Sequence, residues 1–288
     1  MPDQPAGRLH GWTVRAAPAG LVKPLQAAVK GGPGPAVVLL HGQPGTGADW
    51  QRTAALLRDD FTLVVPDRPG YGATGGPATG FAGNATAVVA LLDRLGVDRA
   101  VVVGHSWAGA VGLALATAHA ERVAGLVLVA SVGPGETFGW EDRLLAAPLV
   151  GELIAGTAIG GVGLVLGSRR VQAVADRRLP GRAREAVTAL TRLTRNRAPV
   201  WRSFVAEQRA LIDELDGLSA DLAAIAAPTV ILHGDADHIV EPEVSARLQQ
   251  AIPAATLHLL GGTGHLIPHD RPEAVAAAVR EVAGSARG

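Results

Sequence analysis

Five short apolar runs, separated by helical patterns, constrain the fold of this chain most. The runs cover residues 35–40, 62–65, 100–103, 125–130 and 229–232. None of them alternates apolar with polar side chains, which suits strands that are buried on both faces of a parallel sheet. Between the runs, apolar residues recur at helical spacing, as in Val88, Leu91 and Leu95 before Gly96, a residue that commonly ends helices. The alternation predicts an α/β fold with a mostly parallel, doubly wound sheet.

The alternation stops between about residues 133 and 218. That segment has helical patterns but no convincing strand, although strands are predicted on either side of it. We therefore expect a core formed by residues 1–132 and 219–288 and a helical insertion over residues 133–218. Ligands of open α/β sheets bind beyond the carboxyl ends of the strands, and we expect the insertion to cover them there. Two earlier stretches, about residues 9–16 and 22–29, predict an antiparallel hairpin at the edge of the sheet.

The composition excludes several classes of function. The 288 residues include no cysteine, which rules out disulfides, thiolate metal sites and thiol chemistry. The 26 basic and 26 acidic residues balance, so there is no overall electrostatic basis for nucleic-acid binding. Residues 1–20 lack the basic start and continuous apolar segment of a secretory signal, so we expect a cytoplasmic protein.

Two neighbouring parts of the insertion stand out. Residues 153–167 are apolar and glycine-rich, but this stretch is shorter than the ~20 residues that a transmembrane helix needs. We expect a buried helix there that lines the substrate pocket. Residues 168–202 contain ten arginines, which form either a solvated helical face or a surface that attracts anionic substrates or membrane interfaces.

The segment Gly104-His105-Ser106-Trp107-Ala108-Gly109 follows a predicted buried strand and precedes a run of small residues. On a sharp turn from a strand into a helix, a serine between small residues presents its hydroxyl as an exposed nucleophile. The residues two positions away, Gly104 and Ala108, must be small because larger side chains would collide across the strained turn. The alternative is that Ser106 only caps the helix that follows it.

A serine hydroxyl is a weak nucleophile unless a base takes its proton, and an acid must hold that base. Asp237 follows the strand predicted over residues 229–232, and His265 lies in a glycine-rich turn before the last helical pattern. Ser106, Asp237 and His265 are therefore the candidate catalytic residues, with Asp235 as a competing acid. Four side chains in this region are an alternative metal site, but their spacing fits no standard tetrahedral pattern, and we expect no metal. The four are His233, Asp235, Asp237 and His238.

With these motifs the sequence resembles the α/β-hydrolase family, in the branch with a serine nucleophile and a helical cap. The resemblance covers about residues 30–285 and includes the segments 41–45 (HGQPG) and 67–72 (DRPGYG). It implies that the backbone N–H groups of Gln43 and Trp107 form an oxyanion hole. Family members with aspartate as the nucleophile open epoxides or displace halide, so Ser106 favours acyl transfer. Ala108 stands where the family commonly has glycine, and alanine is small enough to fit.

The residues and the resemblance together predict a cofactor-independent serine hydrolase that cleaves a small, partly hydrophobic carboxylic ester through an acyl-enzyme. The same site also suits hydrolysis of carbon–carbon bonds or lactones, perhydrolysis, or a non-hydrolytic cyclase or lyase reaction. A catalytically inactive binding protein is a further alternative. No oligomeric state is predicted.

Aromatic and histidine side chains near the motifs and in the insertion are candidates for substrate contact. They are His41, His105, Trp140, Trp201 and Phe204. Each has a structural alternative. His41 can hydrogen-bond within its own loop, His105 can pack beside the serine, and the three aromatic residues can belong to the core.

Overall fold

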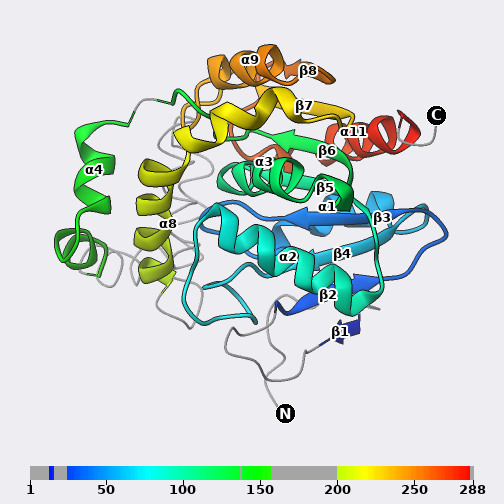
Figure 1. Cartoon of the computed structure of the whole chain (residues 1–288), viewed down its shortest axis with the longest axis horizontal. Helices are drawn as coiled ribbons and strands as arrows, with labels where there is room; N and C mark the ends of the chain where they lie inside the picture. The colour runs from blue at the N-terminus through cyan, green and yellow to red at the C-terminus, as the bar shows by residue number, and fades with distance from the viewer. Residues whose placement is uncertain (1–12, 16–24, 137, 157–199, 286–288) are drawn as a thin grey trace.

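An eight-stranded sheet forms the centre of the computed structural model, which describes residues 13–15, 25–136, 138–156 and 200–285 (Figure 1). Its strand order is β1-β2-β4-β3-β5-β6-β7-β8. The strands β3 to β8 run parallel to their neighbours within this group, whereas β1 and β2 add an antiparallel edge. The bounds are β1 (Thr13–Arg15), β2 (Ala27–Lys30), β3 (Ala36–Leu40), β4 (Thr62–Pro66), β5 (Ala100–His105), β6 (Val123–Val129), β7 (Thr229–Gly234) and β8 (Ala255–Leu260).

The five predicted strands are confirmed as β3 to β7, and the predicted edge hairpin is confirmed as far as β1 pairs with β2. Residues 9–12, 16 and 22–24 of the predicted hairpin lie outside the described residues. The apolar runs are continuous because both faces of the sheet are covered. Val37 and Val101 pack into one apolar cluster, while Val38 and Val102, one position later, pack into the other.

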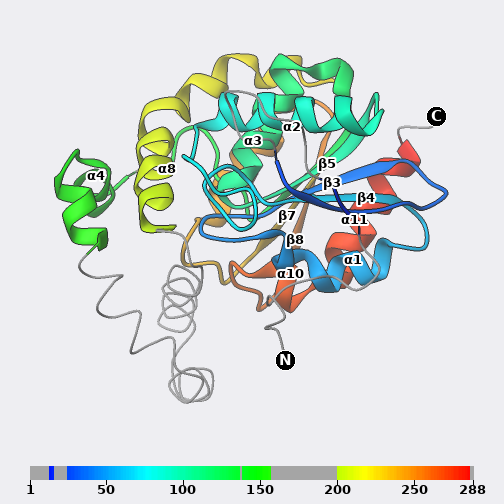
Figure 2. The same ribbon diagram turned by 90° about the horizontal axis from the view of Figure 1, so that it is seen from below.

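Helices form these two covers (Figure 2). On one face pack α2 (Phe81–Leu95), α3 (Trp107–Ala118) and α9 (Pro242–Ala251), and on the other α1 (Gln51–Leu57) and α11 (Pro272–Ser285). Gly96 ends α2 as predicted, with a φ of 65° that glycine adopts without strain. The connections contain α10 (Ile267–Asp270) and the 3-10 helices η1 (Gly47–Trp50), η2 (Ala120–Arg122) and η3 (Asp216–Ala224).

The segment between β6 and β7 supplies α4 (Trp140–Ala146), a helical stretch over residues 150–156, and α8 (Val200–Glu214). Figures 1 and 2 show α4 and α8 beside one end of the sheet. Between residues 133 and 218, the described part contains helices and no strand, in agreement with the predicted insertion. The limits of that insertion as a separate domain stay a prediction.

Most of the apolar segment 153–167 and of the arginine-rich segment 168–202 lies in residues 157–199, outside the described residues. Leu153, at the start of the apolar segment, is exposed and does not line the pocket described below. Among the helices that the structure describes, none is long and apolar enough to cross a membrane.

Candidate active site

Ser106 lies at the turn between β5 and α3, where the chain reverses from the sheet into a helix. Its backbone has a φ of 55° and a ψ of −124°, a strained combination for a residue with a side chain. A Cβ at Gly104 would overlap the backbone carbonyl oxygen of Ala108 and lie 2.8 Å from its carbonyl carbon. Gly104 must therefore be glycine, whereas Ala108 fits with its side chain fully buried. This is the sharp turn predicted from the sequence.

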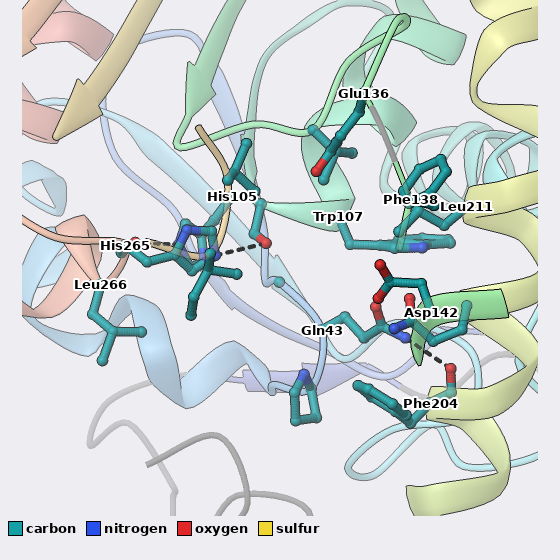
Figure 3. Close-up of a pocket in the computed structure, with 17 residues that line it drawn as sticks. Gln43, His105, Trp107, Glu136, Phe138, Asp142, Phe204, Leu211, His265 and Leu266 are labelled. Carbon is teal, nitrogen blue, oxygen red and sulfur yellow. Dashed lines mark hydrogen bonds between the residues drawn. The ribbon is translucent and has the colours of Figure 1, made fainter. Parts of the chain in front are cut away.

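The hydroxyl of Ser106 belongs to a hydrogen-bonded series with His265 and Asp237. Ser106 Oγ lies 2.8 Å from His265 Nε2, a hydrogen bond marked by a dashed line at His265 in Figure 3. On the other side of the ring, His265 Nδ1 lies 2.8 Å from Asp237 Oδ2. With Nδ1 protonated, His265 donates to the carboxylate and leaves Nε2 free to accept from the serine hydroxyl. All three side chains are at least nine-tenths buried. A serine in this geometry can lose its proton to the imidazole as it attacks an electrophile.

Asp237 is held from two sides. Its Oδ1 accepts from the backbone N–H groups of Ile239 (2.8 Å) and Val240 (3.1 Å). Its Oδ2 faces His233 Nε2 at 3.3 Å in addition to His265. Burial raises the pKa of Asp237, but the hydrogen bonds from His233 and His265 and the charge of His265 outweigh that effect and hold the pKa below its usual range. The carboxylate therefore stays ionised at neutral pH.

Asp235, the competing acid, is exposed and accepts a hydrogen bond from the backbone N–H of Gly262 at 2.7 Å. It supports the turn that leads to His265 and does not face the imidazole. His233 is fully buried, with Nδ1 2.6 Å from Ser245 Oγ and Nε2 3.0 Å from the carbonyl oxygen of Val240. The described residues contain no group of three or more side chains placed to hold a metal ion.

The predicted oxyanion donors are the backbone N–H groups of Trp107 and Gln43, and both residues line the same cavity as Ser106. Trp107 is the first residue of α3, so its N–H is among those that a helix leaves without a partner. Gln43 lies in the loop after β3, and its side-chain Nε2 donates to the carbonyl oxygen of Phe204 in α8 at 2.8 Å (Figure 3). Within the described residues, neither backbone N–H donates to another group. Helix N-termini and such free N–H groups stabilise negative charge.

Ser106 and His265 open into a cavity of about 330 Å³. Figure 3 shows His265 and Leu266 on one side of it, and Phe138, Leu211 and Phe204 on the other. Most of the described lining is apolar. It consists of Pro44, Trp107, Val132, Phe138, Phe204, Leu211, Ile239, Val240 and Leu266, with Gln43, His105, Glu136, Asp142 and Gln208 as polar members beside Gly42, Ser106 and His265.

Two of the five side chains predicted to contact substrate line this cavity. Phe204 projects into it from α8. His105, at the end of β5, lines the cavity and also packs against His265, with ring centroids 5.1 Å apart. His105 Nε2 also lies 2.9 Å from the carbonyl oxygen of His265, so both alternatives for His105 apply.

The other three predictions are corrected by the structure, because His41, Trp140 and Trp201 do not line the cavity. His41 is fully buried, and its ring nitrogens bond to backbone groups, the carbonyl oxygen of Gly42 in its own loop and the N–H of Arg68 in the loop after β4. Trp140 is 71% exposed at the start of α4. Trp201 packs against the small apolar cluster around Tyr71 and is not among the residues that line the cavity.

Several polar residues of the site were missed by the sequence analysis. Glu136 and Asp142 face the cavity, and burial raises the pKa of Glu136 to about 7, with the charge of Asp142 adding to that rise. Neither residue belongs to a motif, so no sequence signal was available. Arg68 and Glu207 form a fully buried ion pair between the loop after β4 and α8. Here a signal existed, because helical spacing places Glu207 on the same face as the apolar Val200 and Leu211.

Comparisons with known proteins agree with this fold. A family model described as the alpha/beta hydrolase fold matches residues 35–272. A 2-hydroxymuconate semialdehyde hydrolase of Pseudomonas putida is 31% identical over 249 residues, which cover 81% of this chain and 82% of that protein. Haloalkane dehalogenase 2 of Mycobacterium tuberculosis is 30% identical over 265 residues, covering 87% and 88%.

Among solved structures, a thermophilic esterase from Thermogutta terrifontis shares the fold with a TM-score of 0.72 at 24% identity, over 92% of this chain and 95% of that one. The family model spans most of this chain, and two relatives at 30% identity or more extend over more than four-fifths of it. The chain belongs to the alpha/beta hydrolase family.

Proposed function

We propose that this hydrolase cleaves a carboxylic ester of a small, partly hydrophobic substrate through an acyl-enzyme on Ser106. The observation that supports the proposal most is the hydrogen-bonded series Ser106–His265–Asp237 at the wall of the cavity, with two contacts of 2.8 Å. Neutral His265 would take the proton from Ser106 Oγ as that oxygen bonds to the ester carbonyl carbon. Asp237 would stabilise the imidazolium that results.

The carbonyl oxygen becomes negative as the tetrahedral intermediate forms, and the N–H groups of Gln43 and Trp107 would donate to it. When the intermediate collapses, the bond to the alcohol oxygen breaks and His265 returns its proton to that alcohol. A water molecule, deprotonated by the same imidazole, then attacks the acyl carbon and releases the acid. The insertion over residues 133–218 would act as the cap that excludes bulk water, and its helix α8 contributes Phe204 and Leu211 to the apolar lining of the pocket.

Ser106 disfavours the reaction of the dehalogenase relative on chemical grounds. A carboxylate that displaces halide leaves an ester, which water can then cleave at its carbonyl group. A serine oxygen that displaced halide would leave an ether, which has no carbonyl group for water to attack. An oxyanion hole gives no help in cleaving that bond.

Hydrolysis of a carbon–carbon bond is the second candidate, because a relative at 31% identity is named for such a muconate-type substrate. Muconate derivatives carry carboxylate groups. The described lining of the cavity contains Glu136 and Asp142 and no arginine or lysine, which disfavours an anionic ligand. We therefore rank ester hydrolysis first.

The test combines covalent labelling with a substrate panel. A fluorophosphonate should label the wild type once per chain, at Ser106 in a peptide map, and should leave Ser106→Ala unlabelled. Ser106→Ala should lower kcat on p-nitrophenyl esters by up to about 10⁶-fold, the scale of loss when a nucleophile of this type is removed. Lactones, β-diketones and a 2-hydroxy-6-oxodienoate serve as competing substrates. Retained esterase activity in Ser106→Ala, or a kcat/KM for the dienoate far above that for every ester, would overturn the proposal, and failure of labelling would favour a binding protein.

A further inference from the structure

The buried ion pair between Arg68 and Glu207 touches neither the cavity nor the reacting atoms, yet it is among the most enclosed groups in the described chain. The side chain of Arg68 is 1% exposed and that of Glu207 is 0% exposed. The carboxylate of Glu207 also accepts from Tyr71 Oη at 2.5 Å. Burial raises the pKa of Glu207, while Arg68 and Tyr71, which donate to its carboxylate, act against that rise. Burying two charges costs desolvation energy, so the pair needs further hydrogen bonds for its remaining donors and acceptors.

Arg68 uses its remaining donors on the loop that carries Gln43. Its Nε donates to the carbonyl oxygen of His41 at 2.8 Å, and its Nη2 donates to that of Gly42 at 3.1 Å. Its backbone N–H donates to His41 Nε2 at 3.0 Å, and His41 Nδ1 donates in turn to the Gly42 carbonyl oxygen at 2.9 Å. The Gly42 carbonyl thus has two donors, and one of them belongs to the ion pair.

The Gly42 carbonyl and the Gln43 N–H belong to one peptide unit, and this unit is trans. In a trans peptide the C=O and N–H bonds point in opposite directions. Two donors that fix the carbonyl of Gly42 therefore also fix the direction of the Gln43 N–H, on the side of the peptide away from Arg68. Gly42 and Gln43 line the cavity, and Arg68 does not.

The pair also contacts the second proposed oxyanion donor. The guanidinium of Arg68 lies 4.5 Å from the ring centroid of Trp107. The indole Nε1 of Trp107 donates to the backbone carbonyl oxygen of Glu207 at 3.1 Å. Because Glu207 lies in α8, the same helix that holds Gln43 through Phe204, both donors are tied to one helix of the insertion.

We infer that Arg68 and Glu207 are positioning residues, which hold the Gly42–Gln43 peptide in the orientation that binds the oxyanion and make that orientation depend on the docking of α8. The inference rests on the proposed acyl-transfer function. It assigns the pair an effect on the transition state, where negative charge appears on oxygen, and little effect on the binding of the uncharged ester.

Arg68→Lys is the informative variant. Lysine keeps the charge opposite Glu207, but a single ammonium group cannot also reproduce the fork that bonds to the carbonyls of His41 and Gly42. We expect kcat on p-nitrophenyl butyrate to fall ~10²-fold, the scale of one lost oxyanion donor, with KM within about threefold of wild type. A trifluoromethyl ketone, which forms an oxyanion adduct with the serine, should bind weaker by a factor of ~10², and the pH dependence of kcat should keep its shape.

Arg209→Lys is the matched control. Arg209 lies in α8 two residues after Glu207, and it pairs with Glu152 at 2.5 Å and with the carbonyl oxygen of Ala146. It makes the same kind of forked contact within the insertion without reaching the Gln43 loop. Its kcat and its inhibitor affinity should stay within about twofold of wild type, so a general loosening of α8 is separated from an effect on the oxyanion loop.

Three outcomes would overturn the inference: a raised KM with unchanged kcat, a lowered kcat with unchanged inhibitor affinity, or equal losses in Arg68→Lys and the control. If Arg68→Lys does not fold, Glu207→Gln replaces it, because glutamine keeps the shape and an acceptor for Tyr71 while removing the charge. The same signature is expected there, in weaker form, and its absence counts against the inference. Wild-type labelling by a fluorophosphonate is scored separately, and its failure would reject the proposed function itself.

Discussion

Replacing Asp237 by asparagine tests the proposed mechanism at the residue where the structure predicts the outcome in most detail. One oxygen of Asp237 accepts from the backbone N–H groups of Ile239 and Val240, and the other faces His265 and His233. Backbone N–H groups cannot change their protonation, whereas an imidazole can change its tautomer. The asparagine oxygen should therefore face the backbone, and its NH₂ group should face His265.

An NH₂ group opposite His265 Nδ1 forces that nitrogen to accept a hydrogen bond. The ring proton then moves to Nε2 and points at Ser106 Oγ. A protonated Nε2 can no longer accept the proton of the serine hydroxyl. The side chains stay close to their places, but the base is lost. We expect kcat to fall ~10⁴-fold, which corresponds to ~5.5 kcal/mol of transition-state stabilisation, with little change in KM.

The assay is steady-state hydrolysis of p-nitrophenyl butyrate, with a thermal melt to establish that the variant is folded. Nitrogen-15 NMR of the histidine rings reports the tautomer of His265 directly. Asp235→Asn is the control, because Asp235 is exposed and an asparagine oxygen can still accept from Gly262. That control should retain activity within a few-fold. A loss of less than tenfold in Asp237→Asn, or a His265 ring that keeps its proton on Nδ1, would refute the reasoning.

Two further predictions concern the turn and the pocket. Gly104→Ala should lower the free energy of unfolding in urea by ~1–3 kcal/mol and reduce kcat, because the new Cβ overlaps the backbone of Ala108. Gly217→Ala, where a Cβ meets nothing within 4 Å, should be close to neutral in both measurements. Glu136→Gln should be more stable than wild type above pH 7, by up to ~3 kcal/mol. The reason is that burial raises the pKa of Glu136 from 4.5 in the unfolded chain to about 7. Above pH 7 the ionised carboxylate therefore destabilises the folded wild type, whereas glutamine carries no charge. Urea unfolding across pH should show that advantage shrinking below pH 7 and disappearing near 4.5, and a constant difference would contradict the assignment.

Much of the fold could be predicted because its determinants are local. The strands β3 to β7 are buried on both faces, so their sequences are continuously apolar and can be recognised without knowing what covers them. The turn at Ser106 can be recognised in the sequence by the small residues that its backbone geometry requires. Asp237, after a predicted strand, and His265, in a glycine-rich turn, were predicted as the partners of Ser106, and these side chains do lie within bonding distance.

The choice between two aspartates shows where local reasoning becomes insufficient. Asp235 and Asp237 lie two residues apart after the same strand. The sequence favours Asp237 as the acid, but only the structure shows which carboxylate meets the imidazole. The turn after β7 buries Asp237 against His265 and leaves Asp235 exposed, bonded to Gly262. The pocket aromatics follow the same rule. Phe204 lines the cavity while Trp140 is exposed, because the position of a helix relative to the sheet decides which of its faces meets the substrate.

The sequence by itself therefore determined the sheet, the serine turn and the identity of the candidate catalytic groups, since hydrophobic periodicity and turn chemistry involve only residues close along the chain. Only the tertiary structure decided which side chains support those groups. Arg68 and Glu207 are 139 residues apart, and nothing in either segment specifies the other. Their pairing arises when α8 packs over the carboxyl ends of the strands. There both charges lose their contact with water, so they pair with each other and Arg68 also bonds to the backbone of the Gln43 loop.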